Sequence, residues 1–116
     1  MLAKPTPWTL QAAVELAQKI ELIAPDFDMH VALTGGCLYK LGERKDADFL
    51  FYCKRGTHTD KEALEKRVCG LLEALGTHLG FIMTGRYGWV QKAETADGWP
   101  LDLFFPEDQE GSEYQP

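Results

Sequence analysis

Two aspartates separated by one residue, Asp46 and Asp48, are the residues of this chain best suited to chemistry. They stand at the start of an apolar run, Ala47 to Tyr52, with the composition of a β-strand, and strand side chains alternate between the two faces. We therefore expect both carboxylates on one face and Ala47 and Phe49 on the other. Neighbouring carboxylates repel each other unless a cation lies between them, and hard oxygen ligands suit Mg²⁺ or Mn²⁺.

A third acid, Asp102, lies inside the apolar run Pro100 to Phe105. A carboxylate there is costly to bury alone, so we expect it to face an ion, a cation or water. By itself, it is more simply explained as a solvent-facing residue on an edge strand. Together with Asp46 and Asp48 it favours a single site, and convergence of three acids should raise the pKa of at least one of them.

Two glycines, Gly35 and Gly36, follow the short β-branched and apolar run Val31–Thr34, which predicts a buried strand. Glycine at such a point allows a sharp turn or a close approach of the backbone to a ligand. Residues 37–41 are compatible with a short helix whose free amides point at a phosphate, and equally with a tight turn between two strands.

Three cations, Lys40, Arg44 and Lys45, lie between the glycines and the first aspartates. They are candidates for neutralising a triphosphate, although basic loop residues are commonly only solvated. The candidate phosphate-binding set is therefore Gly35, Gly36, Lys40, Arg44 and Lys45.

This pattern of strand, Gly-Gly turn, Asp-x-Asp and later acid resembles the nucleotidyltransferase superfamily related to DNA polymerase β, in particular its minimal members. The resemblance extends from Val31 to Phe105. It implies that Gly35 and Gly36 hold a triphosphate, that Asp46 and Asp48 bind two Mg²⁺ (or Mn²⁺) ions, and that Asp102 completes the catalytic and metal-binding site.

The implied function is a metal-dependent enzyme that transfers a nucleoside monophosphate from a nucleoside triphosphate, such as ATP, to a hydroxyl acceptor. An inactive nucleotidyltransferase-like module that binds or inhibits a partner protein is the alternative. It is motivated by Lys45, where many members have Ser, and by Cys37, where a hydroxyl residue would help hold phosphate. A third interpretation is a small α+β domain in which the acids match the motif by chance and lie apart.

Two amphipathic helices and five strands are predicted around these residues. Helical periodicity covers residues 10–23 and 59–76, the second opening on a capping-box pattern at Thr59 and ending at Gly76. The strands are predicted at residues 31–34, 47–52, 81–84, 89–93 and 100–105, with Asp97-Gly98 as a hairpin turn. We therefore predict an α+β fold, a mixed sheet of about five strands with both helices packed on one face.

The 116 residues predict one nucleotidyltransferase-like domain, residues 1–105, followed by an acidic, disordered tail, residues 106–116. The formal net charge is −6, and the tail holds four of the 18 acidic residues. This charge argues against broad attraction to nucleic acid, which is expected only as an acceptor. The three cysteines show no zinc or disulfide spacing, and no run resembles a membrane span or a signal peptide, so a cytoplasmic location is expected.

Overall fold

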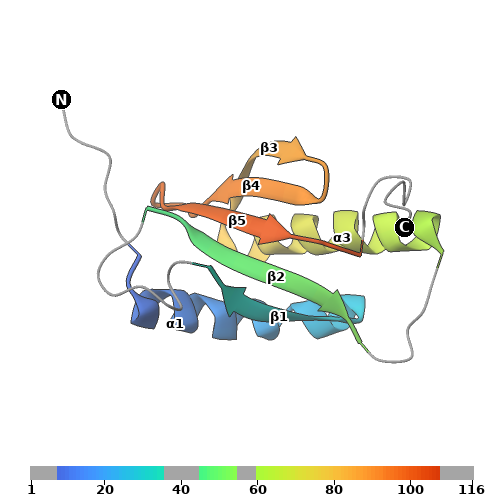
Figure 1. Ribbon diagram of the computed structural model, residues 1–116, viewed down its shortest axis with the longest axis horizontal. Coiled ribbons are helices and arrows are strands. Elements are labelled where there is room, and N and C mark those ends of the chain that lie inside the picture. The colour runs from blue at the N-terminus through green and yellow to red at the C-terminus, as the bar shows by residue number, and fades with distance from the viewer. Residues whose placement is uncertain (1–7, 36–44, 55–59, 108–116) are drawn as a thin grey trace.

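Five strands form one mixed sheet, and two long helices cover one of its faces (Figure 1). The structure, a computed structural model, describes residues 8–35, 45–54 and 60–107. This α+β architecture is the one that the sequence predicts. In chain order the elements are α1 (Leu10–Glu21), the 3-10 helix η1 (Ala24–Phe27), β1 (Met29–Thr34), β2 (Ala47–Cys53), α3 (Lys61–Leu79), β3 (Ile82–Tyr87), β4 (Val90–Glu94) and β5 (Pro100–Phe104).

The strand order across the sheet is β1-β2-β5-β4-β3. Only β2 and β5 pair in parallel, whereas the other neighbours are antiparallel. Parallel strands need a crossover connection, and here the chain passes through α3 and the β3–β4 hairpin before β5 joins β2. Two strands far apart in the sequence therefore lie side by side in the middle of the sheet (Figure 1).

The core lies between the helices and one face of the sheet, and it fixes which way the strand side chains point. Ala47 and Phe49 on β2 and Leu101 and Leu103 on β5 are almost completely buried against the helices. Residues between them must face the opposite side of the sheet. The helix side of this core is formed by Ala13 and Ile20 of α1 and by Leu64, Val68, Leu71 and Leu75 of α3.

Helix α3 differs from the prediction at both ends. Its N-cap is Asp60, whose side chain accepts a hydrogen bond from the backbone N of Ala63 at 2.8 Å, and not Thr59, which lies outside the described residues. The helix continues past Gly76 to Leu79 and is capped by Gly80 at φ +75°. Gly76 lies inside the helix, where a Cβ built on it would be 3.4 Å from the carbonyl oxygen of Phe81, an ordinary van der Waals contact.

The hairpin between β4 and β5 turns where the sequence predicts. Gly98 adopts φ +86°, and its backbone N donates to the carbonyl of Thr95 at 2.8 Å. β3, in contrast, is longer than predicted and reaches Tyr87, with a register irregularity between Met83 and Gly85. No helix in the described ranges is long and apolar enough to cross a membrane.

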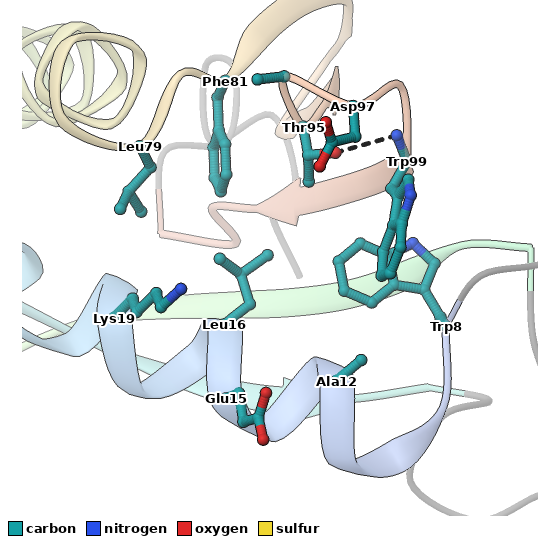
Figure 2. Close-up of a pocket in the computed structure, with 11 residues that line it drawn as sticks. Trp8, Ala12, Glu15, Leu16, Lys19, Leu79, Phe81, Thr95, Asp97 and Trp99 are labelled. Carbon is teal, nitrogen blue, oxygen red and sulfur yellow. Dashed lines mark hydrogen bonds between the residues drawn. The ribbon is translucent and has the colours of Figure 1, made fainter.

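Trp8, which precedes α1, joins this helix to the start of β5. Its side chain is 1% exposed and its indole N–H donates to the carbonyl of Pro100. Its ring meets that of Trp99 edge to face, with centroids 5.1 Å apart (Figure 2). It also meets the ring of Phe49 edge to face, at 6.3 Å. Trp8 thus helps to set the position of β5 two residues before Asp102.

Replacing Trp8 by Ala should lower the free energy of unfolding by roughly 3–5 kcal/mol, because it opens a cavity and leaves the Pro100 carbonyl without its donor. Urea unfolding followed by circular dichroism measures this loss. Trp89→Ala is the matched control, since that side chain is 37% exposed and should cost far less. Equal losses in the two variants would show that Trp8 is not the anchor described.

Candidate functional site

Asp48 on β2 and Asp102 on β5 are directly opposed in the parallel pairing of these strands. Their neighbours Ala47, Phe49 and Leu101 are buried on the helix face, so both carboxylates lie on the other face of the sheet. When Asp48 is protonated, its carboxyl can donate a hydrogen bond to Asp102, and this contact is one cause of its raised pKa. The fold therefore brings together two of the three acids that the sequence selects, although they are more than 50 residues apart in the chain.

Gly35 lies against the Asp48 carboxylate at the end of β1. It has φ +78°, and a Cβ built on it would lie 2.0 Å from Oδ2 of Asp48. Any side chain here would both strain the backbone and collide with the carboxylate. Sequence reasoning assigns Gly35 to phosphate contact; the structure adds that this glycine makes room for Asp48.

Asp46 is exposed and lies one residue before β2. Its negative charge is among the causes that raise the Asp48 pKa, so it contributes to the same electrostatic site. Within the described residues, however, no three His, Cys, Asp or Glu side chains are grouped closely enough to hold a metal ion. Asp48 and Asp102 do fit the one or two carboxylates that Mg²⁺ uses when substrate phosphates and water supply its other ligands.

Lys92 on β4 is the charged neighbour that the sequence analysis missed. Its Nζ is 2.8 Å from Oδ1 of Asp102, and the two residues are partners in the antiparallel β4–β5 register. The observed loop between β4 and β5 is centred on Asp97, with Thr95 opposite Trp99, and this register pairs Lys92 with Asp102. A two-residue turn at Asp97-Gly98 would instead pair Lys92 with Leu103, so the predicted turn did not by itself give this contact. The hydrogen bond to Asp102 raises the pKa of Lys92.

The Asp48 carboxyl holds its proton far more strongly than an ordinary aspartate. Its pKa is raised from 3.8 to about 6, first by burial and then by the charge of Asp102 and the hydrogen bond with it. The charge of Asp46 adds to the increase, and that of Lys92 opposes it. The direction is the one predicted, but burial contributes more than like-charge repulsion.

The structure describes two of the five predicted phosphate-binding residues, Gly35 and Lys45. Gly36, Lys40 and Arg44 are outside the described residues, as is Cys37. Lys45 is described and exposed, immediately before Asp46. Of the two described members, Gly35 is the one that lies against the Asp48 carboxylate.

A separate cavity of about 300 Å³ lies on the helix side, between α1 and the β4–β5 turn (Figure 2). Trp8, Leu16, Phe81 and Trp99 provide its apolar walls, and Lys19 reaches toward it. None of the three acids lines it. The candidate chemistry thus lies on the open face of the sheet and not in this cavity.

Comparison with solved structures identifies the fold. A cytoplasmic RNA terminal U-transferase matches with a TM-score of 0.53 and 12% identity, over 84% of this chain and 28% of that one. The poly(A) polymerase of the GLD-2–GLD-3 complex matches with a TM-score of 0.61 and 16% identity, over 83% and 34%. This is a nucleotidyltransferase-like fold. The chain spans about a third of the length of these neighbours.

The nucleotidyltransferase-like fold is shown by structure alone. No protein-family model matches the sequence, and no curated protein matches it. At identities of 12% and 16%, the similarity establishes how the strands and helices are arranged and leaves the chemistry to be argued from the site.

Asp48 should make the protein less stable as the pH rises. Between about pH 4 and pH 6 the folded state keeps the Asp48 proton that the unfolded state loses, so the folded state binds more protons and its stability falls across this window. Asp48→Asn removes this contribution. Urea unfolding at several pH values should therefore show a shallower decline from pH 4 to 6 in D48N than in the wild type, and parallel curves would contradict the assignment.

Gly35→Ala should destabilise the protein more than its backbone angle alone explains. Gly98→Ala is the control, because Gly98 has a similar φ of +86° and open space around its Cβ position. The control should cost roughly 1–2 kcal/mol, and G35A measurably more. Adding Asp48→Ala to G35A should recover the excess by removing the carboxylate that the methyl group meets. No recovery would mean that the collision is not the cause.

Proposed function

We propose that this protein is a metal-dependent nucleotidyltransferase that transfers a nucleoside monophosphate from a nucleoside triphosphate to a hydroxyl group. The observation that carries the proposal is the opposition of Asp48 and Asp102 on parallel neighbouring strands, beside the positive-φ turn at Gly35. The raised pKa of Asp48, caused by burial and by the neighbouring negative charge of Asp102, is the sign of a site that a cation would stabilise. The nucleotidyltransferase-like fold of the neighbours agrees with this chemistry.

Asp46, Asp48 and Asp102 would hold Mg²⁺ or Mn²⁺, which when bound neutralises charge that develops on the transferring phosphoryl group. Asp102 would accept the proton of the attacking hydroxyl. The hydroxyl oxygen then forms a bond to the α-phosphorus, and the bond to the bridging oxygen breaks as pyrophosphate leaves with the electron pair. For this role the Asp48 carboxyl must be ionised, which its pKa of about 6 allows at neutral pH.

The triphosphate would lie at the turn that begins with Gly35 and Gly36, where a backbone without side chains lets amides reach phosphate oxygens. Lys40, Arg44 and Lys45 would supply positive charge along its length. The acceptor hydroxyl belongs to a nucleic acid end or to another molecule docked on the open face of the sheet. A cytoplasmic location, with access to nucleoside triphosphates, is part of this proposal.

A binding or inhibitory module that acts on a partner protein is the second candidate. It is favoured by the Lys92–Asp102 ion pair, because this contact already satisfies one of the acids that catalysis requires. The absence of a three-ligand metal group among the described residues points the same way. In this case the partner should bind wild-type and D48N protein equally well, with no requirement for Mg²⁺ or nucleotide.

A double-mutant cycle on the two acids tests the enzyme proposal. Asp48→Asn and Asp102→Asn should each abolish the rise in Tm that Mg²⁺ and a triphosphate together produce, since either change removes a ligand of the shared ion. The combined variant should lose no more than each single variant, because the ion is already gone. Differential scanning fluorimetry with each of the four common triphosphates measures the effect.

Glu94→Gln on β4 is the matched control, because it removes one carboxylate from the sheet without touching the site. It should keep the wild-type response to metal and nucleotide. If D48N and D102N changed the ligand-induced rise in Tm by near-zero, additive amounts, the catalytic proposal would be rejected and the binding module would be favoured. Retained Mg²⁺-dependent binding without any nucleotide transfer would do the same.

A further inference from the structure

Lys92 completes a row of side chains that crosses the open face of the sheet. Thr34 pairs with Asp48, Asp48 with Asp102, and Asp102 with Lys92, through the successive registers of β1, β2, β5 and β4. The backbone of Lys92 is thus held in register with the two acids by four hydrogen-bonded strands.

The ion pair is asymmetric in its burial. The Asp102 side chain is 14% exposed, whereas that of Lys92 is 47% exposed. The carboxylate is therefore held in a region of reduced dielectric constant, while the ammonium can move away into water at little cost. Lys92 also interacts electrostatically with Asp46 and Asp48, so its charge acts on the whole acidic group.

Lys92 must compete with any divalent ion at these acids. It occupies Oδ1 of Asp102, one of the oxygens a metal would use, and its positive charge repels a second cation placed between Asp48 and Asp102. A nucleoside triphosphate changes this balance, because its phosphate oxygens add negative charge and further ligands. The metal and the nucleotide should then bind with positive coupling.

We propose that Lys92 is a resident counter-cation that keeps divalent metal out of the site until a nucleoside triphosphate arrives with it. This inference rests on the proposed function and adds a rule to it: metal alone binds weakly, and metal with triphosphate binds well. Lys92 acts through Asp102, so it is a positioning residue. The same pairing explains how two half-buried acids are tolerated before any ligand binds.

The test is to measure Mn²⁺ affinity, without nucleotide and then with a non-hydrolysable triphosphate, for the wild type, Lys92→Met and Lys92→Arg. Water-proton relaxation reports bound Mn²⁺ directly. In K92M the Kd for Mn²⁺ alone should fall on the order of tenfold, because the competing charge is gone. The increase in Mn²⁺ affinity that the nucleotide produces should then be smaller by a similar factor. K92R keeps the charge and should behave as the wild type.

Lys66→Met, an exposed lysine of α3, controls for the loss of one positive charge. In metal-free buffer K92M should also unfold at lower urea than K66M, because it leaves the acids without their cation. Mn²⁺ affinity that is unchanged or weaker in K92M would overturn the proposal. If K92M binds Mn²⁺ alone more tightly than the wild type but no variant binds a triphosphate, Lys92 has the proposed role and the nucleotidyltransferase proposal fails. If no variant binds Mn²⁺, both proposals fail.

Discussion

The parallel pairing of β2 with β5 is the contact on which the candidate site depends. It places Asp48 directly opposite Asp102, where two ionised carboxylates repel each other. The apolar residues that alternate with these acids, Ala47, Phe49, Leu101 and Leu103, hold the strands together from the other face. Burial of those side chains stabilises the strand pairing enough to offset the repulsion between the two acids. The acids are therefore close because the core is well packed.

The two faces of the sheet differ in the residues they carry. One is filled by α1, α3 and the Trp8 ring, which ties the beginning of the described chain to Pro100. The other presents Asp48, Asp102 and Lys92 in register, with Gly35 shaped to the Asp48 carboxylate. Because the same strands serve both faces, a one-residue slip of β5 would exchange Asp102 with a buried leucine. The register of β5 that positions Asp102 is thus the same register that buries its leucines in the core.

Much of this arrangement could be predicted from the sequence because it depends on local pattern. Alternation predicted that Asp48 faces away from Ala47 and Phe49, and Asp97-Gly98 predicted the hairpin before β5. The end of α3 was not predicted correctly, since Gly76 is a good local stop, whereas the helix continues to Leu79 and Gly80 caps it. The Asp48–Gly35 contact was equally inaccessible, because it depends on the β1–β2 register and on a positive φ.

The direction of the Asp48 pKa shift was predicted, together with part of its cause, the charges of Asp102 and Asp46. Like charges near Asp48 could be counted from the sequence, whereas its burial depends on tertiary packing and raises its pKa more. Lys92 was missed because no motif marks it and because its pairing with Asp102 depends on the exact register of the β4–β5 hairpin. Long-range pairing of β2 with β5 was expected only through the family resemblance.

The central claim is that Asp48 and Asp102 jointly bind a divalent ion. Anomalous diffraction from crystals grown with Mn²⁺ and a non-hydrolysable triphosphate tests it most directly. The account predicts a manganese peak bonded to one oxygen of each carboxylate and to the triphosphate, with the hydrogen bond between the two acids gone. A structure with nucleotide or Mn²⁺ bound elsewhere, and Asp48 still donating its proton to Asp102, would contradict it.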